Sequence, residues 1–287
     1  MDLIDAQVHA YERDHPSRPW AGALPGPSAV TADDLVAAMD EVDVSRAILV
    51  SPWTLYREDT SYAVEVYRAY PDRVRLVAPI VVRDHAAADI ATAWASTPGA
   101  VGIRLMAGVA ESFQAGDAAV AATVRAAESA DFPVSVYCPG QLGILDELAQ
   151  RHPDTQFVLD HLGLAQPLTP PPPDDPFAGF DQVLALARYP NIAVKVSAAC
   201  TLSHRPFPFQ DLWGHLGRLF EAFGIDRCLW GTDWTRCLEL VTYPEAVAAF
   251  RDHLPLTLSE REVLLGGAAA RIFRWSRHGS GLESTRA

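Results

Sequence analysis

The chain has 287 residues, of which 49% are hydrophobic and 21% are charged, and its formal net charge at pH 7 is −13. These proportions suit one large globular domain or two small ones, and they exclude a disordered or collagen-like chain. An acidic surface repels phosphate backbones and anionic lipids, so we expect neither a nucleic-acid partner nor a membrane partner.

Short β-branched runs alternate along the chain with amphipathic stretches. The expected strands are Leu3–His9, Arg46–Pro52, Val74–Val81, Ala100–Met106, Pro133–Cys138, Gln156–His161, Ile192–Ser197 and Cys228–Asp233. The expected helices are Thr31–Val42, Ser61–Tyr70, Ala87–Ser96, Ala118–Ala130, Leu142–His152, Phe180–Tyr189, Leu212–Phe223 and Ser259–Trp275. Such alternation indicates parallel βαβ units, and eight of them over about 250 residues are typical of a (β/α)8 TIM-type barrel. An open doubly wound sheet is the alternative, but no glycine-rich nucleotide motif follows the first strand.

Two proline-rich insertions, residues 11–29 and 164–176, follow the first and sixth expected strands. We expect both to be long loops at the carboxyl ends of strands, which is the active-site face of a barrel. A linker between domains is the alternative for the second insertion, but periodic structure resumes on both sides of it. The prediction is therefore one barrel domain over residues 1–278, followed by a disordered tail over 279–287.

The four cysteines form no C-x-x-C pair, which favours a reducing compartment. The first residues show no basic region followed by an apolar stretch, so we expect no signal peptide. No run of apolar residues is long enough to span a bilayer. These features predict a cytoplasmic protein.

Polar residues interrupt the apolar strands at three places. Asp5, Gln7 and His9 alternate along the first strand and therefore project to the same side of it. His161 ends the sixth strand and Asp233 ends the eighth. Because the carboxyl ends of barrel strands converge, we expect His9, His161 and Asp233 to meet around one substrate. The alternatives are a partly solvated loop histidine at position 161 and a helix-capping role for Asp233.

Further candidates lie at neighbouring strand ends. Arg104 can bind a substrate carboxylate, or it can form a buried ion pair, for example with Asp5. Lys195, which shares a side of its strand with Ser197, can contact substrate or form an internal salt bridge. Tyr137 is expected to line the pocket.

The neighbouring Cys138 is not expected to act as a nucleophile, because it lacks a free histidine base. Trp53, with Trp20, Tyr56 and Trp234, lies in or beside the mouth loops and can stack on a flat or sugar-like ring. Packing of the long loops onto the barrel is the alternative for each of these aromatic residues.

The segments Asp5–His9, Asp160–Gly163 and Trp230–Trp234 resemble the corresponding motifs of the amidohydrolase-2 group of the amidohydrolase superfamily. The resemblance extends over residues 3–275, and it is nearest to the sugar-lactone and pyrone-dicarboxylate lactonase branch. It implies a distorted (β/α)8 barrel that hydrolyses an ester, lactone or amide at its carboxyl-end mouth.

The first strand departs from the family pattern. The family's D-x-H-x-H motif often binds a divalent metal through its two histidines, but Gln7 replaces the first of them here. A neutral amide is a poorer zinc ligand than imidazole. Arg104 also stands on the strand where some members carry a bridging carbamylated lysine. We therefore favour a metal-free site, with one zinc or manganese ion held by His9, His161 and Asp233 as the alternative.

The resulting hypothesis is a hydrolase of a small lactone or related cyclic ester. Asp233 would activate water, while His9, His161 and the Gln7 amide would stabilise the developing oxyanion. The substrate would be a small molecule bearing carboxyl or hydroxyl groups, and a homo-oligomer is possible. The alternatives are a metal-dependent decarboxylase or amide hydrolase of the same superfamily and, second, a non-catalytic ligand-binding barrel.

Overall fold

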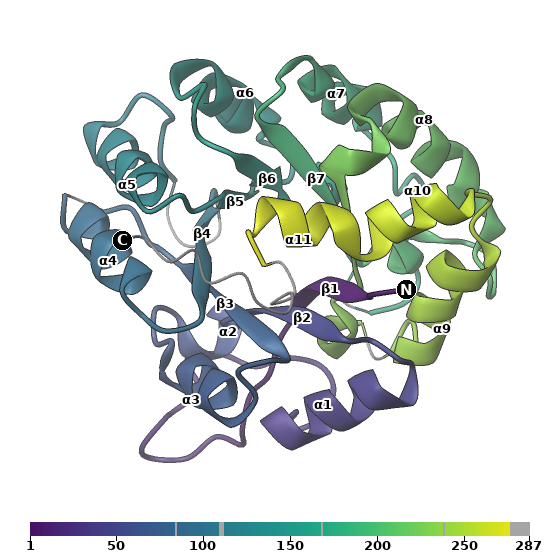
Figure 1. Ribbon diagram of the computed structural model, residues 1–287, viewed down its shortest axis with the longest axis horizontal. Coiled ribbons are helices and arrows are strands. Elements are labelled where there is room, and N and C mark those ends of the chain that lie inside the picture. The colour runs from purple at the N-terminus through teal and green to yellow at the C-terminus, as the bar shows by residue number, and fades with distance from the viewer. Residues whose placement is uncertain (84, 109–111, 168, 238, 276–287) are drawn as a thin grey trace, which may run out of the picture.

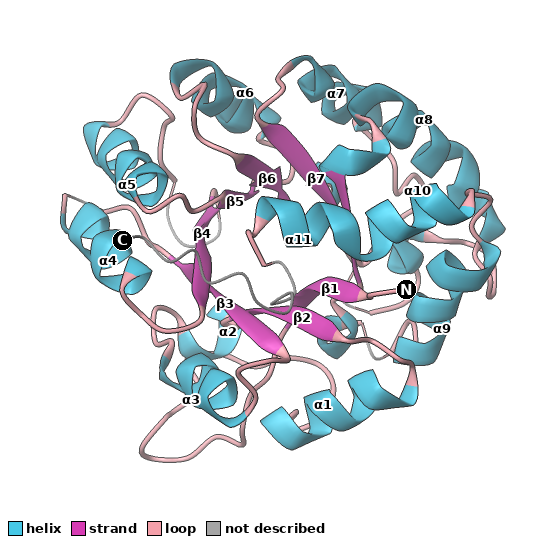
Figure 2. Ribbon diagram, viewed as in Figure 1, coloured by secondary structure: helices cyan, strands magenta, loops and turns pink. Residues whose placement is uncertain are grey.

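The computed structural model describes residues 1–83, 85–108, 112–167, 169–237 and 239–275. Eight parallel strands, with helices packed around them, form a nearly closed barrel (Figures 1 and 2), which confirms the predicted (β/α)8 architecture. The strands are β1 (Ile4–Val8), β2 (Arg46–Val50), β3 (Val74–Pro79), β4 (Ala100–Met106), β5 (Val134–Tyr137), β6 (Phe157–Leu159), β7 (Ile192–Ser197) and β8 (Cys228–Gly231). The α-helices are α1 (Ala32–Glu41), α2 (Trp53–Tyr56), α3 (Ser61–Ala69), α4 (Ala86–Ala95), α5 (Ala118–Ser129), α6 (Leu142–Arg151), α7 (Phe180–Ala185), α8 (Trp213–Phe223), α9 (Tyr243–Ala248), α10 (Leu258–Glu262) and α11 (Ala268–Ile272).

Each strand pairs in parallel with the next one in sequence, from β1 to β8. The two end strands approach at their carboxyl ends, where the Asp233 N–H donates a hydrogen bond to the Gln7 carbonyl at 2.8 Å. Gly231 permits this approach, because a Cβ atom there would lie 3.0 Å from the Gln7 nitrogen and 3.2 Å from the Ser197 Cβ. The carboxyl ends of β1, β7 and β8 are therefore drawn together.

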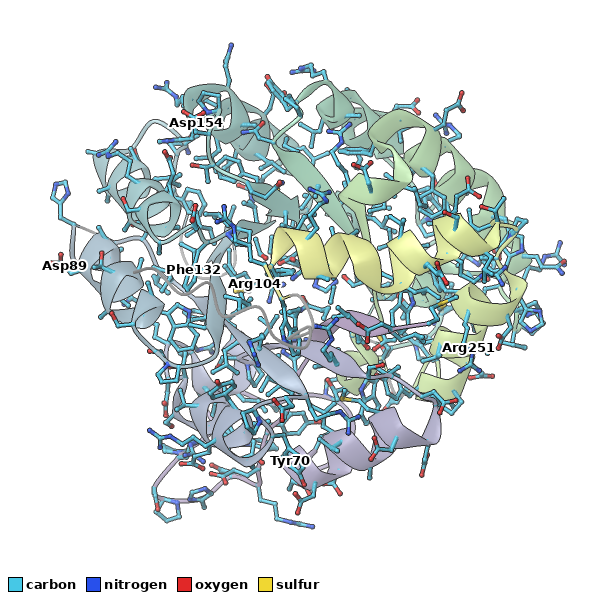
Figure 3. All side chains as sticks on the ribbon, viewed as in Figure 1. Tyr70, Asp89, Arg104, Phe132, Asp154 and Arg251 are labelled. Carbon is cyan, nitrogen blue, oxygen red and sulfur yellow. The ribbon has the colours of Figure 1, made fainter. Side chains whose placement is uncertain are left out.

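The core has one large cluster around the barrel, a smaller one inside it, and a third formed by Trp53, Val81 and Met106. The smaller cluster joins inward-facing strand residues such as Ile48 and Val77 to Ile272 and Phe273 at the end of α11. Helix α11, yellow in Figure 1, crosses the near end of the barrel. Figure 3 shows Arg104 within the ring of strands, while the exposed Asp89 and Asp154 lie at the rim.

Several predicted helices differ from the structure. The expected helix 259–275 is divided into α10, a π-helical turn at Val263–Gly267, and α11. Its Gly266 lies against β1, since a Cβ atom there would meet the Asp2 carbonyl oxygen. The expected helix 180–189 ends as α7 and continues as a 3-10 turn at Leu186–Arg188. The sequence analysis missed α2 and α9.

The first proline-rich insertion carries only isolated antiparallel bridges, Tyr11 with Val30 and His15 with Arg18. The predicted tail at 279–287 lies outside the described residues. Among the helices of the described ranges, none combines the length and apolar composition needed to cross a membrane.

Candidate active site

A cavity of about 120 Å³ opens at the carboxyl ends of the strands. It is lined by His9, Trp53, Thr54, Arg104, Met106, Tyr137, His161, Gln166, Asp233 and Arg236. Six of the eight predicted site residues belong to this lining, whereas Gln7 and Lys195 lie beneath it in the barrel interior. The sequence analysis did not single out Thr54, Met106, Gln166 or Arg236.

The chain adopts a left-handed backbone where these strands end. His161 and Asp233 both have a φ of 52°, and Ala198, after β7, has a φ of 54°. For this reason β6 and β8 end at Leu159 and Gly231, two residues before the predicted ends at His161 and Asp233. A non-glycine residue in this region costs about 1 kcal/mol or more, so the chain carries backbone strain at each of these three strand ends.

Asp5 holds the turn that carries Asp233. Its Oδ1 accepts hydrogen bonds from the backbone N–H groups of Thr232 at 2.9 Å and Gln7 at 3.1 Å. Its Oδ2 accepts a short hydrogen bond from the Thr232 hydroxyl. The suggested pairing of Asp5 with Arg104 is therefore wrong, because both Asp5 carboxylate oxygens accept hydrogen bonds from Thr232, the residue that follows β8, and from Gln7.

His9 is oriented by the main chain of β2. Its Nδ1 lies 2.6 Å from the Val50 carbonyl oxygen, and since a carbonyl only accepts, Nδ1 carries the proton. The other nitrogen, Nε2, faces Asp233 Oδ1 at 3.2 Å. Within the described residues this carboxylate oxygen is buried and makes no well-aligned hydrogen bond. The Gln7 side-chain nitrogen also lies 3.5 Å from Nε2. A protonated His9 would pair with Asp233, whereas a neutral His9 would accept from the Gln7 amide and leave Asp233 Oδ1 open to a water molecule.

His161 is held by two neighbours. Arg104 Nη2 lies 3.2 Å from His161 Nε2, and because a guanidinium only donates, Nε2 is the acceptor. The proton of the neutral ring therefore sits on Nδ1, which lies 2.9 Å from the Ser197 hydroxyl oxygen and 3.9 Å from Asp233 Oδ2. Burial lowers the pKa of His161 to about 4, so the ring is neutral at pH 7.

Asp233 is ionised at neutral pH. Burial alone would raise the pKa of this carboxyl group, but its contact with His9 and the positive charge of Arg236 help to hold the pKa below its usual value. No side-chain hydrogen bond from Asp233 caps the 3-10 turn that follows it. The capping alternative is thus not what the structure shows, and the carboxylate faces the cavity.

A buried ion cluster supports the floor of the cavity. Asp160 accepts a hydrogen bond from Arg104 Nε at 2.6 Å, and its other oxygen lies 3.0 Å from Lys195 Nζ. Lys195 also donates to Gln7 Oε1 at 2.8 Å. Arg104 and Lys195 therefore form internal salt bridges, which was the alternative considered for each of them, and both pair with Asp160. Gln7 supports Lys195 from beneath and does not line the cavity.

The predicted aromatic residues divide into two groups. Trp53 lines the cavity. Trp20 instead donates its indole N–H to the Glu12 carbonyl at 3.0 Å, and Tyr56 packs against the same loop. Trp234 stacks on Tyr243, with ring centroids 4.9 Å apart. Only Trp53 is placed to stack on a bound ring, and the others pack the loops.

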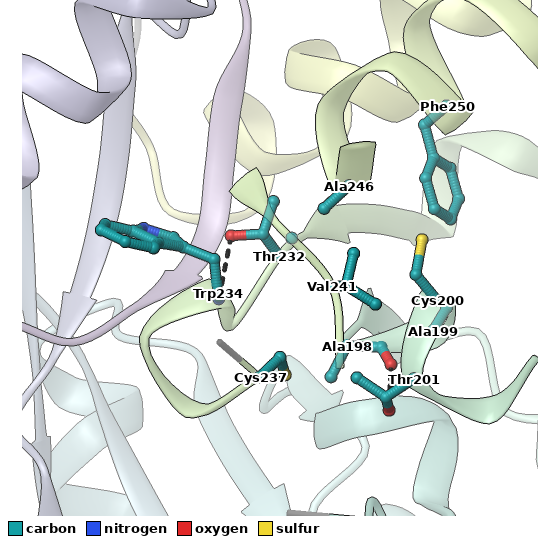
Figure 4. A pocket seen from close by; sticks show the side chains of 11 residues that line it. Ala198, Ala199, Cys200, Thr201, Thr232, Trp234, Cys237, Val241, Ala246 and Phe250 are labelled. Atoms are coloured by element: carbon teal, nitrogen blue, oxygen red, sulfur yellow. Dashed lines mark hydrogen bonds between the residues drawn. The ribbon is translucent and has the colours of Figure 1, made fainter. Parts of the chain in front are cut away.

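Cys138 is excluded as a thiolate nucleophile, since burial raises its pKa to about 12. A second, smaller cavity of about 10 Å³ lies beside the end of β8 and has Cys200 and Cys237 among its lining residues (Figure 4). In the same view the backbone N–H of Trp234 donates to the Thr232 hydroxyl oxygen at 3.3 Å. This cavity is about the size of one water molecule, so it does not hold a substrate.

The described residues do not fit a resident divalent ion. Catalytic zinc usually takes three protein ligands, and in the described part of the chain no three His, Cys, Asp or Glu side chains are grouped for this. His161 is bonded on both ring nitrogens, and the Gln7 oxygen accepts from Lys195. His9 Nε2 lies 3.5 Å from the Gln7 side-chain nitrogen and 3.2 Å from Asp233 Oδ1. The chemistry below is therefore derived from the chain's own groups.

Comparison with known proteins relates this chain to enzymes of one family. The family model described as Amidohydrolase matches residues 4–275. The L-fucono-1,5-lactonase of Burkholderia multivorans is 29% identical over 141 residues, which are 46% of this chain and 48% of that protein. The chain thus matches about half the length of this curated relative.

Two solved structures share the fold. A probable 2-pyrone-4,6-dicarboxylic acid hydrolase from Acinetobacter baumannii, with citric acid bound, has a TM-score of 0.75 at 20% identity, covering 96% of this chain and 100% of that one. An amidohydrolase from Burkholderia multivorans with bound zinc has a TM-score of 0.74 at 23% identity, covering 96% and 99% of the two chains.

Proposed function

The chain belongs to the amidohydrolase family, and on that premise we propose that it is a hydrolase that opens a small lactone or related cyclic ester. The observation that carries the proposal is the Asp233 carboxylate. It is buried, ionised and flanked by two histidines, and its Oδ1 lacks a well-aligned hydrogen bond within the described residues. An anionic oxygen with a free lone pair beside a cavity can take a proton from water.

In the proposed reaction, a water molecule beside Asp233 attacks the lactone carbonyl carbon and gives its proton to the carboxylate. The carbonyl oxygen then carries a negative charge, and His9 would stabilise it by a hydrogen bond from Nε2, the nitrogen that faces Asp233, when that nitrogen carries a proton. Collapse of this intermediate breaks the ring C–O bond, and the leaving alkoxide takes the proton from Asp233. The product is an open-chain hydroxy acid, so the atoms and charges balance.

The surrounding residues orient these groups. Val50 fixes the His9 ring through Nδ1, and Arg104 fixes the His161 tautomer through Nε2. Proton transfer by a positioned base contributes about 10²- to 10⁴-fold to rate, and one well-placed oxyanion donor contributes about 3 kcal/mol. The cavity is small compared with the roughly 300–1,000 Å³ of pockets for drug-sized ligands, which favours a substrate with a single ring.

The test is turnover of a panel of γ-lactones, δ-lactones and sugar lactones, followed by the acid that each releases. Asp233→Asn keeps the shape of the side chain and removes the base, and asparagine tolerates the left-handed backbone at this position. We expect its kcat to fall about 10³-fold, because the general base is removed. Asp226→Asn, which changes a surface carboxylate, is the control.

Equal rates for wild type and Asp233→Asn across the panel would overturn the proposed role of this carboxylate. Release of carbon dioxide from aromatic carboxylates, without lactone opening, would assign the site to decarboxylation instead. Ligand binding without turnover of any substrate would favour a non-catalytic barrel.

A further inference from the structure

Arg236 is a cavity cation that forms no close ion pair within the described residues, although its charge acts on Asp233 from a longer distance. It ends the 3-10 turn Trp234–Arg236 that follows β8, and it lines the same cavity as Asp233. Its Nη1 donates to the Thr54 hydroxyl at 3.3 Å, and its buried Nε makes no hydrogen bond to the described part of the chain. Within that part, no salt bridge of 4.0 Å or less joins Arg236 to a carboxylate.

The other cavity arginine is differently placed. Arg104 is bonded to the Asp160 carboxylate and to the His161 ring, so its charge is balanced within the protein. A partly buried guanidinium that lacks such a counter-charge is costly, and it binds planar anions well through its fork of N–H groups. Arg236 is therefore the better candidate to bind an anionic group of the substrate, whereas the sequence analysis considered Arg104 for that contact.

A second donor lies in the same cavity. The Tyr137 side chain lines it, and among the described residues the Tyr137 hydroxyl makes no hydrogen bond. A guanidinium and a phenol hydroxyl can together bind the two oxygens of one carboxylate. The acidic protein as a whole repels anions, so capture of an anionic substrate requires such a local cation.

We propose that Arg236 binds a carboxylate of the substrate, and that the substrate is a lactone whose ring carries this carboxylate. The inference rests on the proposed lactone hydrolysis and names its substrate class. Arg236 anchors the ring by its charged substituent, so that the ester carbonyl lies within reach of the water beside Asp233.

The experiment compares two matched lactones, paraconate and its carboxamide, which share the ring and differ in charge. In the wild type we expect kcat/KM to be higher for paraconate. Arg236→Gln should lower kcat/KM for paraconate by roughly 30- to 100-fold, the loss of a charge-assisted hydrogen bond, while changing the carboxamide less than about threefold. The control Arg218→Gln removes the charge of an arginine whose side chain is 52% exposed and which pairs with Asp181 outside the cavity, and it should change both less than about threefold.

Two kinetic results would overturn the proposal. One is equal or better turnover of the carboxamide by the wild type. The other is an equal loss on both lactones in Arg236→Gln, which would show that Arg236 only holds the loop against Thr54.

A binding measurement separates this proposal from the proposed function. Cyclopentanecarboxylate and cyclopentanecarboxamide have no ester to cleave, and calorimetry measures their affinity for wild type and Arg236→Gln. If neither lactone is hydrolysed, selective binding of the carboxylate that is lost in Arg236→Gln still supports the anchor. Absence of that selectivity would overturn the anchor even if other lactones are hydrolysed.

Discussion

Asp160→Asn is the substitution for which the structure predicts the largest loss of stability. This carboxylate is fully buried and contacts two cations, Arg104 Nε at 2.6 Å and Lys195 Nζ at 3.0 Å. Asparagine has nearly the same volume, so packing is retained while the negative charge is lost. The two cations then remain buried beside each other, with no carboxylate between them.

The expected cost follows from this burial. Removing one partner of a buried ion pair destabilises a protein by about 3–5 kcal/mol, because the remaining charge is left uncompensated. The matched control is Asp146→Asn, which removes the acidic partner of Arg188 at the surface, where the Arg188 side chain is 55% exposed. Exposed pairs contribute about 0–1 kcal/mol, so the control should unfold nearly as the wild type does.

Urea denaturation at pH 7 measures both variants. The charges of Lys195 and Arg104 outweigh the burial of Asp160 and hold its pKa well below the usual range. The stabilisation is therefore present above the ordinary aspartate pKa of about 4 and is lost as the pH falls below it. A loss below 1 kcal/mol for Asp160→Asn, or one equal to that of Asp146→Asn, would refute the ion-cluster account.

Two further predictions concern His161 and Gln7. Because burial lowers the pKa of His161 to about 4, its contribution to stability is present above about pH 6.5 and falls by up to about 3 kcal/mol towards pH 4. In His161→Asn, whose asparagine tolerates the positive φ, the free energy of unfolding should change less with pH between about pH 4 and pH 6.5. An unchanged pH dependence would contradict the assignment of this effect to His161. Gln7→His should not bind zinc, because the Lys195 ammonium group lies 2.8 Å from the Gln7 oxygen and would repel a second cation. Elemental analysis of the purified variant measures this. Stoichiometric zinc would show that the Lys195 side chain has been displaced.

The repeating pattern of the fold was readable from the sequence. Periodicity predicted all eight strands, and β4 and β7 have the same bounds as predicted. The ends of β6 and β8 were overestimated, because their continuation into left-handed residues depends on tertiary contacts and leaves no mark in local propensity. Helices α2 and α9 are too short for a 3.6-residue period to show clearly.

The site was partly readable. Polar residues at strand ends located His9, His161 and Asp233, which the structure brings to one cavity. Which charges neutralise one another could not be read, since the pairing of Arg104 and Lys195 with Asp160 joins β4, β7 and the residue after β6. Arg236 had a signal that went unused: it stands three residues after Asp233 in the same loop.

The central claim is that Asp233 deprotonates a water molecule which attacks the lactone carbonyl directly. A single turnover in water enriched in heavy oxygen, with enzyme in excess over lactone, tests it by mass spectrometry of product and protein. We expect one heavy oxygen in the carboxylate of the released hydroxy acid and none in the peptide containing Asp233. Heavy oxygen in that peptide would show that Asp233 attacks the carbonyl itself, and it would contradict the account.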